Sequence, residues 1–312
     1  MTRAETAERA AALIRARAHG RCETFMPLGS LTSYQLGGPA DVYIEAESEE
    51  DLAALADALD ETGLPLLVIG RGSNMLVSDE GFPGIAVRLG GGFRWARVEG
   101  TAVAAGGAMP VPALASLAAG ASLAGLEFAA AIPASFGGAI AMNAGAHHRS
   151  ISEVLIEATV FDLSARSSRT IDAADLGFVY RASALPAGSI VTAGLAALGP
   201  GDPDEIAAGM REAREWRRAT QPVGLPNAGS VFKNPPEEAA GSLVERICGK
   251  GTTHGGARIS EVHANFIVAE PGATAADVHT LIRRIQRQVL ENAGVRLETE
   301  VKLIGRFEES GE

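Results

Sequence analysis

The stretch from residue 101 to residue 146 restricts the fold of this chain more than any other. Among its many alanines and glycines it carries a single charged residue, Glu127. Pro110, Pro112 and Pro133 interrupt it, so it contains no unbroken apolar run of the about 20 residues that a membrane span requires. We therefore expect buried backbone, where small residues let main chain lie against neighbouring segments or a ligand.

The composition limits the class of protein. The chain has 312 residues, of which 46% are hydrophobic, which is enough for two or three domains with sizeable cores. The formal net charge of −11 argues against a general nucleic-acid binder or a protein of anionic membrane surfaces, whose binding faces are basic. A local basic pocket for a small anion is compatible with this charge.

The N-terminus and the cysteines indicate a cytoplasmic protein. Residues 1–18 are charged throughout and lack the apolar run of a signal peptide. The two cysteines, Cys22 and Cys248, have neither the spacing of a metal site nor that of a disulfide framework, as is usual in a reducing compartment. We expect no bound metal.

Residues 39–70 carry the local signals of a β-α-β unit. Strands are expected at 39–45 and 65–70. Between them Ser48 precedes three acidic residues and opens a helix, which a glycine and a proline close. An amphipathic helix at 3–18 is expected to lie outside the main fold.

The rest of the chain mixes short strands with longer helices, which is typical of the α+β class. The break at Gln221-Pro222 marks a domain boundary. The expected helices lie at 111–119, 203–219, 241–248 and 274–293, and the expected strands at 154–162, 190–198, 263–269 and 297–305.

Two glycine-rich segments are candidates for ligand binding. GRGSN at 70–74 follows a strand, where successive N–H groups can bind an anion. The dinucleotide pattern G-x-G-x-x-G fails at Met75 and no helix is expected to follow, so a plain turn is equally compatible. In residues 131–146 the glycines would let backbone approach a flat or phosphorylated ligand, and Ser135 and Asn143 would add hydrogen bonds. The alternative is a tightly packed core of small residues.

Two further segments present single polar side chains. Arg181 stands among small and apolar residues in FVYRASAL, where a guanidinium needs a partner. A ligand carboxylate would suit it, although a structural ion pair is the commoner arrangement. In AGSVFKNP, Ser230, Lys233 and Asn234 place a hydroxyl, an ammonium and an amide in one short arc. Alone, this segment would be read as a strand ending in a polar turn.

The last expected strand, 297–305, alternates charged and apolar residues. Because alternate residues of a strand share a face, Glu298, Glu300 and Lys302 should point one way and the apolar residues the other. A solvated strand face would explain these charges equally well.

Six segments in register resemble the MurB family, the UDP-N-acetylenolpyruvoylglucosamine reductases. They are TSYQLGGPADVY, GRGSNMLVSDEG, IPASFGGAIAMNAGA, YRAS, TQP followed by AGSVFKNP, and GGARISEVHANFIV, and they lie between Thr32 and Gly305. The resemblance implies a two-lobed FAD-binding domain of the vanillyl-alcohol-oxidase type and a smaller α/β substrate-binding domain. The implied boundaries are 1–20 for an N-terminal helical extension, 21–95 and 96–222 for the two lobes, 223–296 for the substrate domain, and 297–312 for a strand returning to the active site.

The resemblance also implies a reaction. Members of this family reduce UDP-N-acetylglucosamine enolpyruvate to UDP-N-acetylmuramate, a peptidoglycan precursor, with non-covalently bound FAD and with NADPH as the reductant. Hydride would go to the vinyl carbon and a proton to the adjacent carbon. A monomer or weak oligomer is expected, with no nucleic acid or membrane partner.

Residue roles follow from the matching motifs. Arg181 would stabilise the carboxylate of the substrate, Ser230 would donate the proton, and Glu300 would hydrogen-bond the enolic acid or orient a proton-relay water. Only 49 residues separate Arg181 from Ser230 (230 − 181), too few for the inserted tyrosine loop of the longer subclass, so the type II form is implied. The expected substrate-binding residues are Lys233, Asn234, Arg218 and Lys302. The expected cofactor-binding residues are Gly70, Arg71, Gly72, Ser73, Asn74, Met75, Ile132, Pro133, Ala134, Ser135, Gly137, Gly138, Asn143, Ala144 and Gly145.

The chain departs from the family pattern at several positions. Ala131 and Ala134 stand where the family has glycines, and His147 and His148 where it tends to carry an aromatic residue and a glycine. Two other hypotheses therefore stay open. One is a different flavin oxidoreductase on the same fold, and the other is a non-catalytic UDP-sugar-binding paralogue. A histidine attached covalently to flavin is a further alternative, although the position of the pair does not match the usual attachment motif.

Overall fold

The computed structural model describes residues 2–308, and its internal contacts divide the chain into two compact units. Unit 1 takes in the chain up to Phe25, Asp41–Arg71 and Gly84–Trp216. Unit 2 takes in Met26–Ala40, Gly72–Pro83 and the chain from Arg217 onward. The lobes expected at 21–95 and 96–222 do not coincide with unit 1, because residues 26–40 and 72–83 of the first and 217–222 of the second belong to unit 2.

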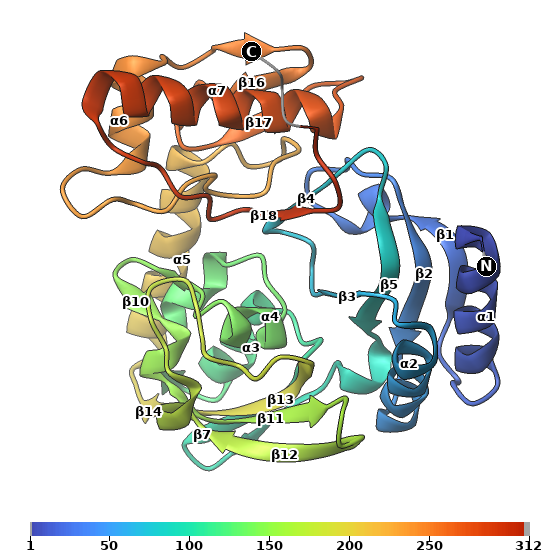
Figure 1. Cartoon of the computed structure of the whole chain (residues 1–312). Coiled ribbons are helices and arrows are strands. Elements are labelled where there is room, and N and C mark those ends of the chain that lie inside the picture. Colours follow the sequence, from blue (N-terminus) through green and yellow to red (C-terminus); the bar gives the residue numbers. More distant parts are fainter. Residues whose placement is uncertain (1, 309–312) are drawn as a thin grey trace. The chain divides into compact units, whose positions relative to one another are not determined.

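The first sheet of the fold has the strand order β1-β2-β5-β3 (Figure 1). Strand β3 pairs in parallel with β5, with Leu66 opposite Ile85. The expected β-α-β unit is present: Ser48 Oγ accepts a hydrogen bond from Asp51 N at 3.3 Å and caps helix α2, which ends at Gly63 with φ 64°. The elements are β1 Cys22–Pro27, β2 Pro39–Ala46, α2 Glu49–Thr62, β3 Leu66–Ile69 and β5 Phe82–Leu89.

The N-terminal helix α1, Arg3–Arg15, is part of unit 1, and its expected position outside the main fold is wrong. One face carries Ala7, Ala10, Ala11 and Ile14, all with 0% exposure, in one apolar cluster with α2 and the first sheet. The spacing of these residues along the helix explains the amphipathic pattern.

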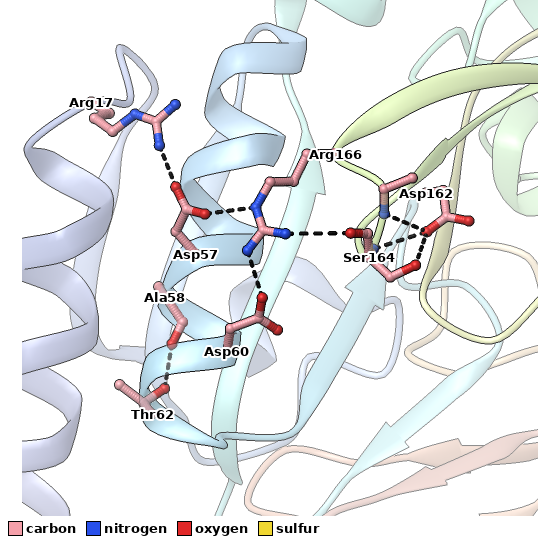
Figure 2. A network of polar contacts seen from close by, with 9 residues as sticks. Arg17, Asp57, Ala58, Asp60, Thr62, Asp162, Ser164 and Arg166 are labelled. Atoms are coloured by element: carbon pink, nitrogen blue, oxygen red, sulfur yellow. Dashed lines mark hydrogen bonds and ion pairs between the residues drawn. The ribbon is translucent and has the colours of Figure 1, made fainter.

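Arg166 links α2 to the turn between two strands of the second sheet (Figure 2). Its guanidinium lies 2.7 Å from Asp57 Oδ1 and 2.5 Å from Asp60 Oδ2, both on α2. Arg17, just after α1, also pairs with Asp57. This network of ion pairs therefore joins three separate segments of unit 1 on its surface, where each pair contributes little to stability by itself.

The second sheet of unit 1 is entirely antiparallel, in the order β12-β11-β13-β7-β6. Its core includes Val103, Phe136 and Ile140, which are fully buried. The strands are β6 Ala96–Glu99, β7 Ala102–Gly106, β11 Leu155–Asp162, β12 Ser167–Asp172 and β13 Ser189–Ala197, and the helices α3 Val111–Gly120, α4 Phe136–Ala141 and α5 Pro203–Thr220. Shorter pieces are β8 Leu123–Ala124, β9 Gly145–Ala146, β10 Arg149–Ser150, β14 Gly199–Pro200 and the 3₁₀ turns η2 Gly91–Phe93, η3 Glu127–Ala131, η4 Ile151–Glu153 and η5 Ala173–Leu176.

Unit 2 packs two helices with a small antiparallel sheet, β15-β16-β17. Asp79 fixes the start of α7, because its carboxylate accepts hydrogen bonds from Ala275 N and Ala276 N at 2.9 Å each. The elements are η1 Leu28–Leu31, β4 Met75–Val77, α6 Ala240–Ile247, β15 Thr253–His254, β16 Ala257–Ile259, β17 Ile267–Ala269, α7 Ala275–Ala293 and β18 Lys302–Ile304.

The strand expected at 297–305 is only partly correct. Thr299 forms an isolated bridge with Phe232, the chain bends at 300–301, and β18 then pairs in parallel with β4. Because the bend breaks the alternation, Val301 is 2% exposed whereas Leu303 is 36% exposed. The strand expected at 263–269 is likewise reduced to β17, since a tight turn occupies the residues before it.

Within residues 2–308, no helix is long and apolar enough to cross a membrane. The small-residue stretch 101–146 instead forms strands, helices and turns, and many of its alanines lie in the core of unit 1 or pack against it.

Candidate active site

The two glycine-rich segments meet at Gly70 and Ser135, in unit 1. A Cβ on Gly70 would lie 2.6 Å from Ser135 Oγ, so a larger residue there would displace the Ser135 hydroxyl. Ser135 is 5% exposed and caps α4, accepting a hydrogen bond from Gly138 N at 3.3 Å. No helix follows the GRGSN loop, as expected, and strand β4 begins at Met75 instead.

Protein backbone accounts for Gly137 in α4 without any ligand. A Cβ on Gly137 would lie 2.8 Å from the carbonyl oxygen of Val191. The N–H groups of Phe136 and Gly137 donate to Met109 O and Gly107 O, at 2.8 and 2.9 Å. The N–H groups in the first turn of this helix therefore bind acceptors within unit 1 and not a ligand.

The GRGSN loop has the donors that a phosphorylated cofactor requires. Within the described residues, the main-chain N–H groups of Arg71, Gly72, Ser73 and Asn74 make no hydrogen bond. Four successive N–H groups without a protein acceptor are donors that suit phosphate oxygens. The residues present therefore fit the diphosphate of a dinucleotide such as FAD.

Asn74 also makes two hydrogen bonds to the segment that carries Glu300. Its Nδ2 donates to Glu300 O at 3.1 Å, and its carbonyl oxygen accepts from Lys302 N at 3.0 Å. Both contacts lie in unit 2. The remaining expected cofactor residues are placed as follows: Met75 opens β4, Ile132, Ala134 and Ala144 pack on the core of unit 1, Pro133 is exposed, and Gly145 opens β9.

The departures from the family pattern fit the fold. Neither Ala131 nor Ala134 has a positive φ, so a Cβ is compatible with both backbones. His147 and His148 have φ values of 52° and 61° and form the two-residue turn between β9 and β10. The His147 ring also packs edge-on against Trp216, with the centroids 4.8 Å apart.

Asn143, expected to bind the cofactor, has both ends of its carboxamide engaged by protein backbone. Its Nδ2 donates to Val179 O and its Oδ1 accepts from Ser152 N, each at 3.1 Å. The residue is 7% exposed, with φ 41°. Asn143 therefore anchors the segment that leads to Arg181.

Arg181 lies in a two-residue turn with a left-handed backbone. Val179 N donates to Ala182 O at 3.0 Å, and Ala182 N donates back to Val179 O at 3.2 Å. Arg181 has φ 59°, a conformation that costs a non-glycine residue about 1–3 kcal/mol and is concentrated at functional sites. Ser183 Oγ, which donates to Ala141 O at 2.8 Å, adds a second tie to the segment of Asn143. The guanidinium lies 5.0 Å from the centre of the Tyr180 ring.

Main-chain hydrogen bonds bring the Ser230 and Glu300 segments together in unit 2. Glu300 N donates to Val231 O at 2.8 Å, and Lys233 N donates to Glu298 O at 2.9 Å. Within the described residues, the hydroxyl of Ser230 makes no hydrogen bond, so it is available to a ligand. Gly229 precedes it with φ 76°, a conformation that favours glycine.

The expected substrate residues have unequal surroundings. Lys233 Nζ pairs with Glu298 Oε2 at 3.1 Å, and Asn234 Oδ1 accepts from Ala240 N at 3.0 Å at the start of α6. Arg218, in the last turn of α5, and Lys302, in β18, are exposed.

Sequence reasoning missed the residues that hold the Ser230 segment. Asn227 Oδ1 accepts from Gly229 N at 2.9 Å, and Asn265 binds the main chain of Phe232. The one available signal was an asparagine among the apolar residues of ANFIV, because a polar side chain buried there must find partners. No cluster of three or more histidine, cysteine, aspartate or glutamate side chains suited to a metal ion occurs in residues 2–308.

Comparisons with known proteins agree with this arrangement. Residues 221–304 match the C-terminal domain of UDP-N-acetylenolpyruvoylglucosamine reductase, and residues 40–166 match an FAD binding domain. A UDP-N-acetylenolpyruvoylglucosamine reductase 2 of Symbiobacterium thermophilum is 44% identical over 96% of each chain, and a reductase of Heliobacterium modesticaldum is 43% identical over 89% of each. The crystal structure of MurB from Thermus caldophilus superimposes with a TM-score of 0.81 at 36% identity, covering 92% of this chain and 100% of that one. The chain belongs to the MurB family of UDP-N-acetylenolpyruvoylglucosamine reductases, with an FAD-binding domain and a MurB C-terminal domain.

Proposed function

We propose that this protein reduces UDP-N-acetylglucosamine enolpyruvate to UDP-N-acetylmuramate with electrons from NADPH, carried by bound FAD. Family membership supports the reaction. The observation that carries the proposal for this chain is the hydrogen bond from Glu300 N to Val231 O, 2.8 Å long, which sets Glu300 beside the Ser230 segment. The Ser230 hydroxyl, which makes no hydrogen bond within the described residues, is then a candidate proton donor with a carboxylate residue on the neighbouring segment.

The GRGSN loop and Ser135 are the groups proposed to hold FAD. The N–H groups of Arg71–Asn74 would bind its diphosphate, and Gly70 leaves room for Ser135 beside the loop. Bound FAD supplies hydride chemistry that amino-acid side chains lack. Non-covalent binding is proposed because the position of His147 and His148, in the β9–β10 turn, does not match the usual motif for covalent attachment.

Arg181 is proposed to bind the carboxylate of the enolpyruvyl group. As hydride reaches the vinyl carbon, negative charge moves toward that carboxylate, and a guanidinium held in place stabilises it without reorganising. The ties from Asn143 and Ser183 to the turn provide such rigidity. They also compensate for the left-handed backbone of Arg181.

Ser230 is proposed to protonate the carbon next to the carboxylate. Such general acid catalysis contributes about 10²–10⁴-fold. Glu300 would hydrogen-bond the enolic acid or orient a proton-relay water. Lys233, Asn234, Arg218 and Lys302 would bind the anionic groups of the substrate, and the pairing of Lys233 with Glu298 would then have to loosen when substrate arrives.

The proposed setting is the cytoplasm, where NADPH and the UDP-sugar are made available and where free thiols such as Cys22 and Cys248 persist. A monomer or weak oligomer is proposed.

The test is a visible spectrum of the purified protein, followed by NADPH oxidation with and without UDP-N-acetylglucosamine enolpyruvate. Bound flavin and NADPH loss that depends on the substrate would support the proposal. Bound flavin with no response to this substrate would favour a different oxidoreductase on the same fold. A colourless protein that stays inert after added FAD would favour a non-catalytic UDP-sugar-binding protein.

A further inference from the structure

The side chain of Asn265 pairs with the main chain of Phe232 in the way that the main chain of a neighbouring β-strand would. Nδ2 donates to Phe232 O at 2.8 Å, and Phe232 N donates to Oδ1 at 2.9 Å. In addition, Val231 N donates to the main-chain carbonyl of Asn265 at 2.8 Å. One residue, 3% exposed, therefore makes three hydrogen bonds to the two residues that follow Ser230.

The opposite edge of the same segment carries Glu300. Val231 O accepts from Glu300 N at 2.8 Å, and Phe232 bridges Thr299. Residues 231–233 therefore lie between Asn265 on one side and residues 298–301 on the other. The lateral position of this segment, and with it the spacing of Ser230 and Glu300, depends on both sides.

The turn that presents Asn265 is itself fixed. Asn265 N donates to His263 Nδ1 at 3.1 Å, and His263 N and Val262 N both donate to Ser260 Oγ, at 3.5 and 3.1 Å. Ser260 is 2% exposed. The Asn265 side chain is therefore buried, held at both ends of its carboxamide and carried by a turn that has hydrogen bonds of its own, which restricts its movement.

We infer that Asn265 is a positioning residue, which holds Ser230 at the distance from Glu300 that proton delivery requires. The inference rests on the proposed function of Ser230. A carboxamide suits this role because it offers a donor and an acceptor with the geometry of a peptide group. Aspartate has nearly the same shape but would place an oxygen against Phe232 O, so attraction at that point would become repulsion.

The test compares Asn265→Asp with wild type in the two half-reactions of the flavin-bound protein. Reduction of the flavin by NADPH should stay within about twofold, whereas its reoxidation by UDP-N-acetylglucosamine enolpyruvate should slow by about 10–100-fold, because displacements of about 1 Å cost this much. The effect should fall on kcat more than on the KM for NADPH. Asn265→Gln, which keeps the carboxamide one methylene further out, should give an intermediate rate and serves where the aspartate variant does not fold.

Asp51 provides the matched control. It is 0% exposed, and its carboxylate accepts from the main-chain N–H groups of His19, Gly20 and Glu47, at 2.8, 3.1 and 2.7 Å. Asp51→Asn makes the reverse exchange of the same atoms in unit 1. It should lower the stability of the protein while leaving the rates of both half-reactions unchanged. The control would thereby show that a loss of stability alone does not cause the slow reoxidation expected of Asn265→Asp.

Two results would overturn the inference. One is an Asn265→Asp variant with wild-type reoxidation, and the other is an equal loss in both half-reactions, which would mean a general structural role. Ser230→Ala, measured alongside, separates this failure from that of the proposed function. If Ser230→Ala reoxidises normally, the role of Ser230 itself is wrong; if only Asn265→Asp does so, the positioning role alone is wrong.

Discussion

Replacing Ile14 by alanine tests whether helix α1 is an integral part of unit 1. The side chain is fully buried, in one cluster with α2 and the first sheet. Removing three carbons from such a site costs about 2–5 kcal/mol, part of it from the cavity left behind. Alanine is a better helix former than isoleucine, which offsets only a few tenths of a kcal/mol. We expect a net loss of about 3 kcal/mol, and hence a fall in Tm of about 6–12 °C.

The assay is thermal and urea unfolding followed by tryptophan fluorescence. Both tryptophans of the chain, Trp95 and Trp216, belong to unit 1, so the signal reports the unit in question. Leu13→Ala is the matched control, because Leu13 is adjacent and only half-buried. It should lose less than half as much stability. Equal and small losses, below about 1 kcal/mol for both variants, would refute the docking of α1.

Three other predictions follow from the geometry. Burial lowers the pKa of His263 and of His279 below the usual 6.5, so as the pH drops these histidines are protonated in the unfolded chain before they are protonated in the folded one. The free energy of unfolding should therefore be full above about pH 6.5 and fall at lower pH. Urea titrations from about pH 7.5 to 5 should show a shallower fall for the variant in which both histidines are replaced by glutamine. A pH-independent stability would contradict this. His148→Gly should raise stability by about 1 kcal/mol in the same titration, because φ 61° is strained for histidine; a loss would mean that the side chain is needed. Asn143→Asp removes the hydrogen-bond donor to Val179 O and should slow substrate-dependent flavin reoxidation by about tenfold or more, while the protein keeps its flavin. An unchanged rate would mean that the position of Arg181 does not depend on this hydrogen bond.

Elements set by local chemistry were predictable from the sequence. Helix α2 is the best case: the Ser48 cap, the acidic first turn and the left-handed Gly63 are all signals within the helix or next to it. The absence of a helix after the GRGSN loop was also expected correctly, although the strand β4 that takes its place was not predicted.

Features that depend on distant partners were not predictable. The strand expected at 297–305 fails because its pairing changes from the Ser230 segment to β4, which forces the bend at 300–301. The amphipathic pattern of α1 was visible in the sequence, but the helix was expected outside the main fold, because the pattern does not tell what covers its apolar face. Asn265 and Asn143 bind main chain 33 and 36 residues away, and no local pattern indicates such a partner.

The three residues assigned to catalysis were found through motifs, not through periodicity. The structure adds how each is held: a strained turn for Arg181, a free hydroxyl for Ser230 and a strand-like pairing for Glu300. Their roles in the reaction remain proposals.

The central claim is that Ser230 acts only after the flavin is reduced, as the proton donor to the substrate. The most direct measurement is double-mixing stopped flow on Ser230→Ala under anaerobic conditions, with flavin absorbance as the signal. Bleaching by NADPH should match wild type, and its recovery on adding UDP-N-acetylglucosamine enolpyruvate should be slower by about 10²-fold or more. Recovery at the wild-type rate, or equal slowing of both steps, would contradict the account.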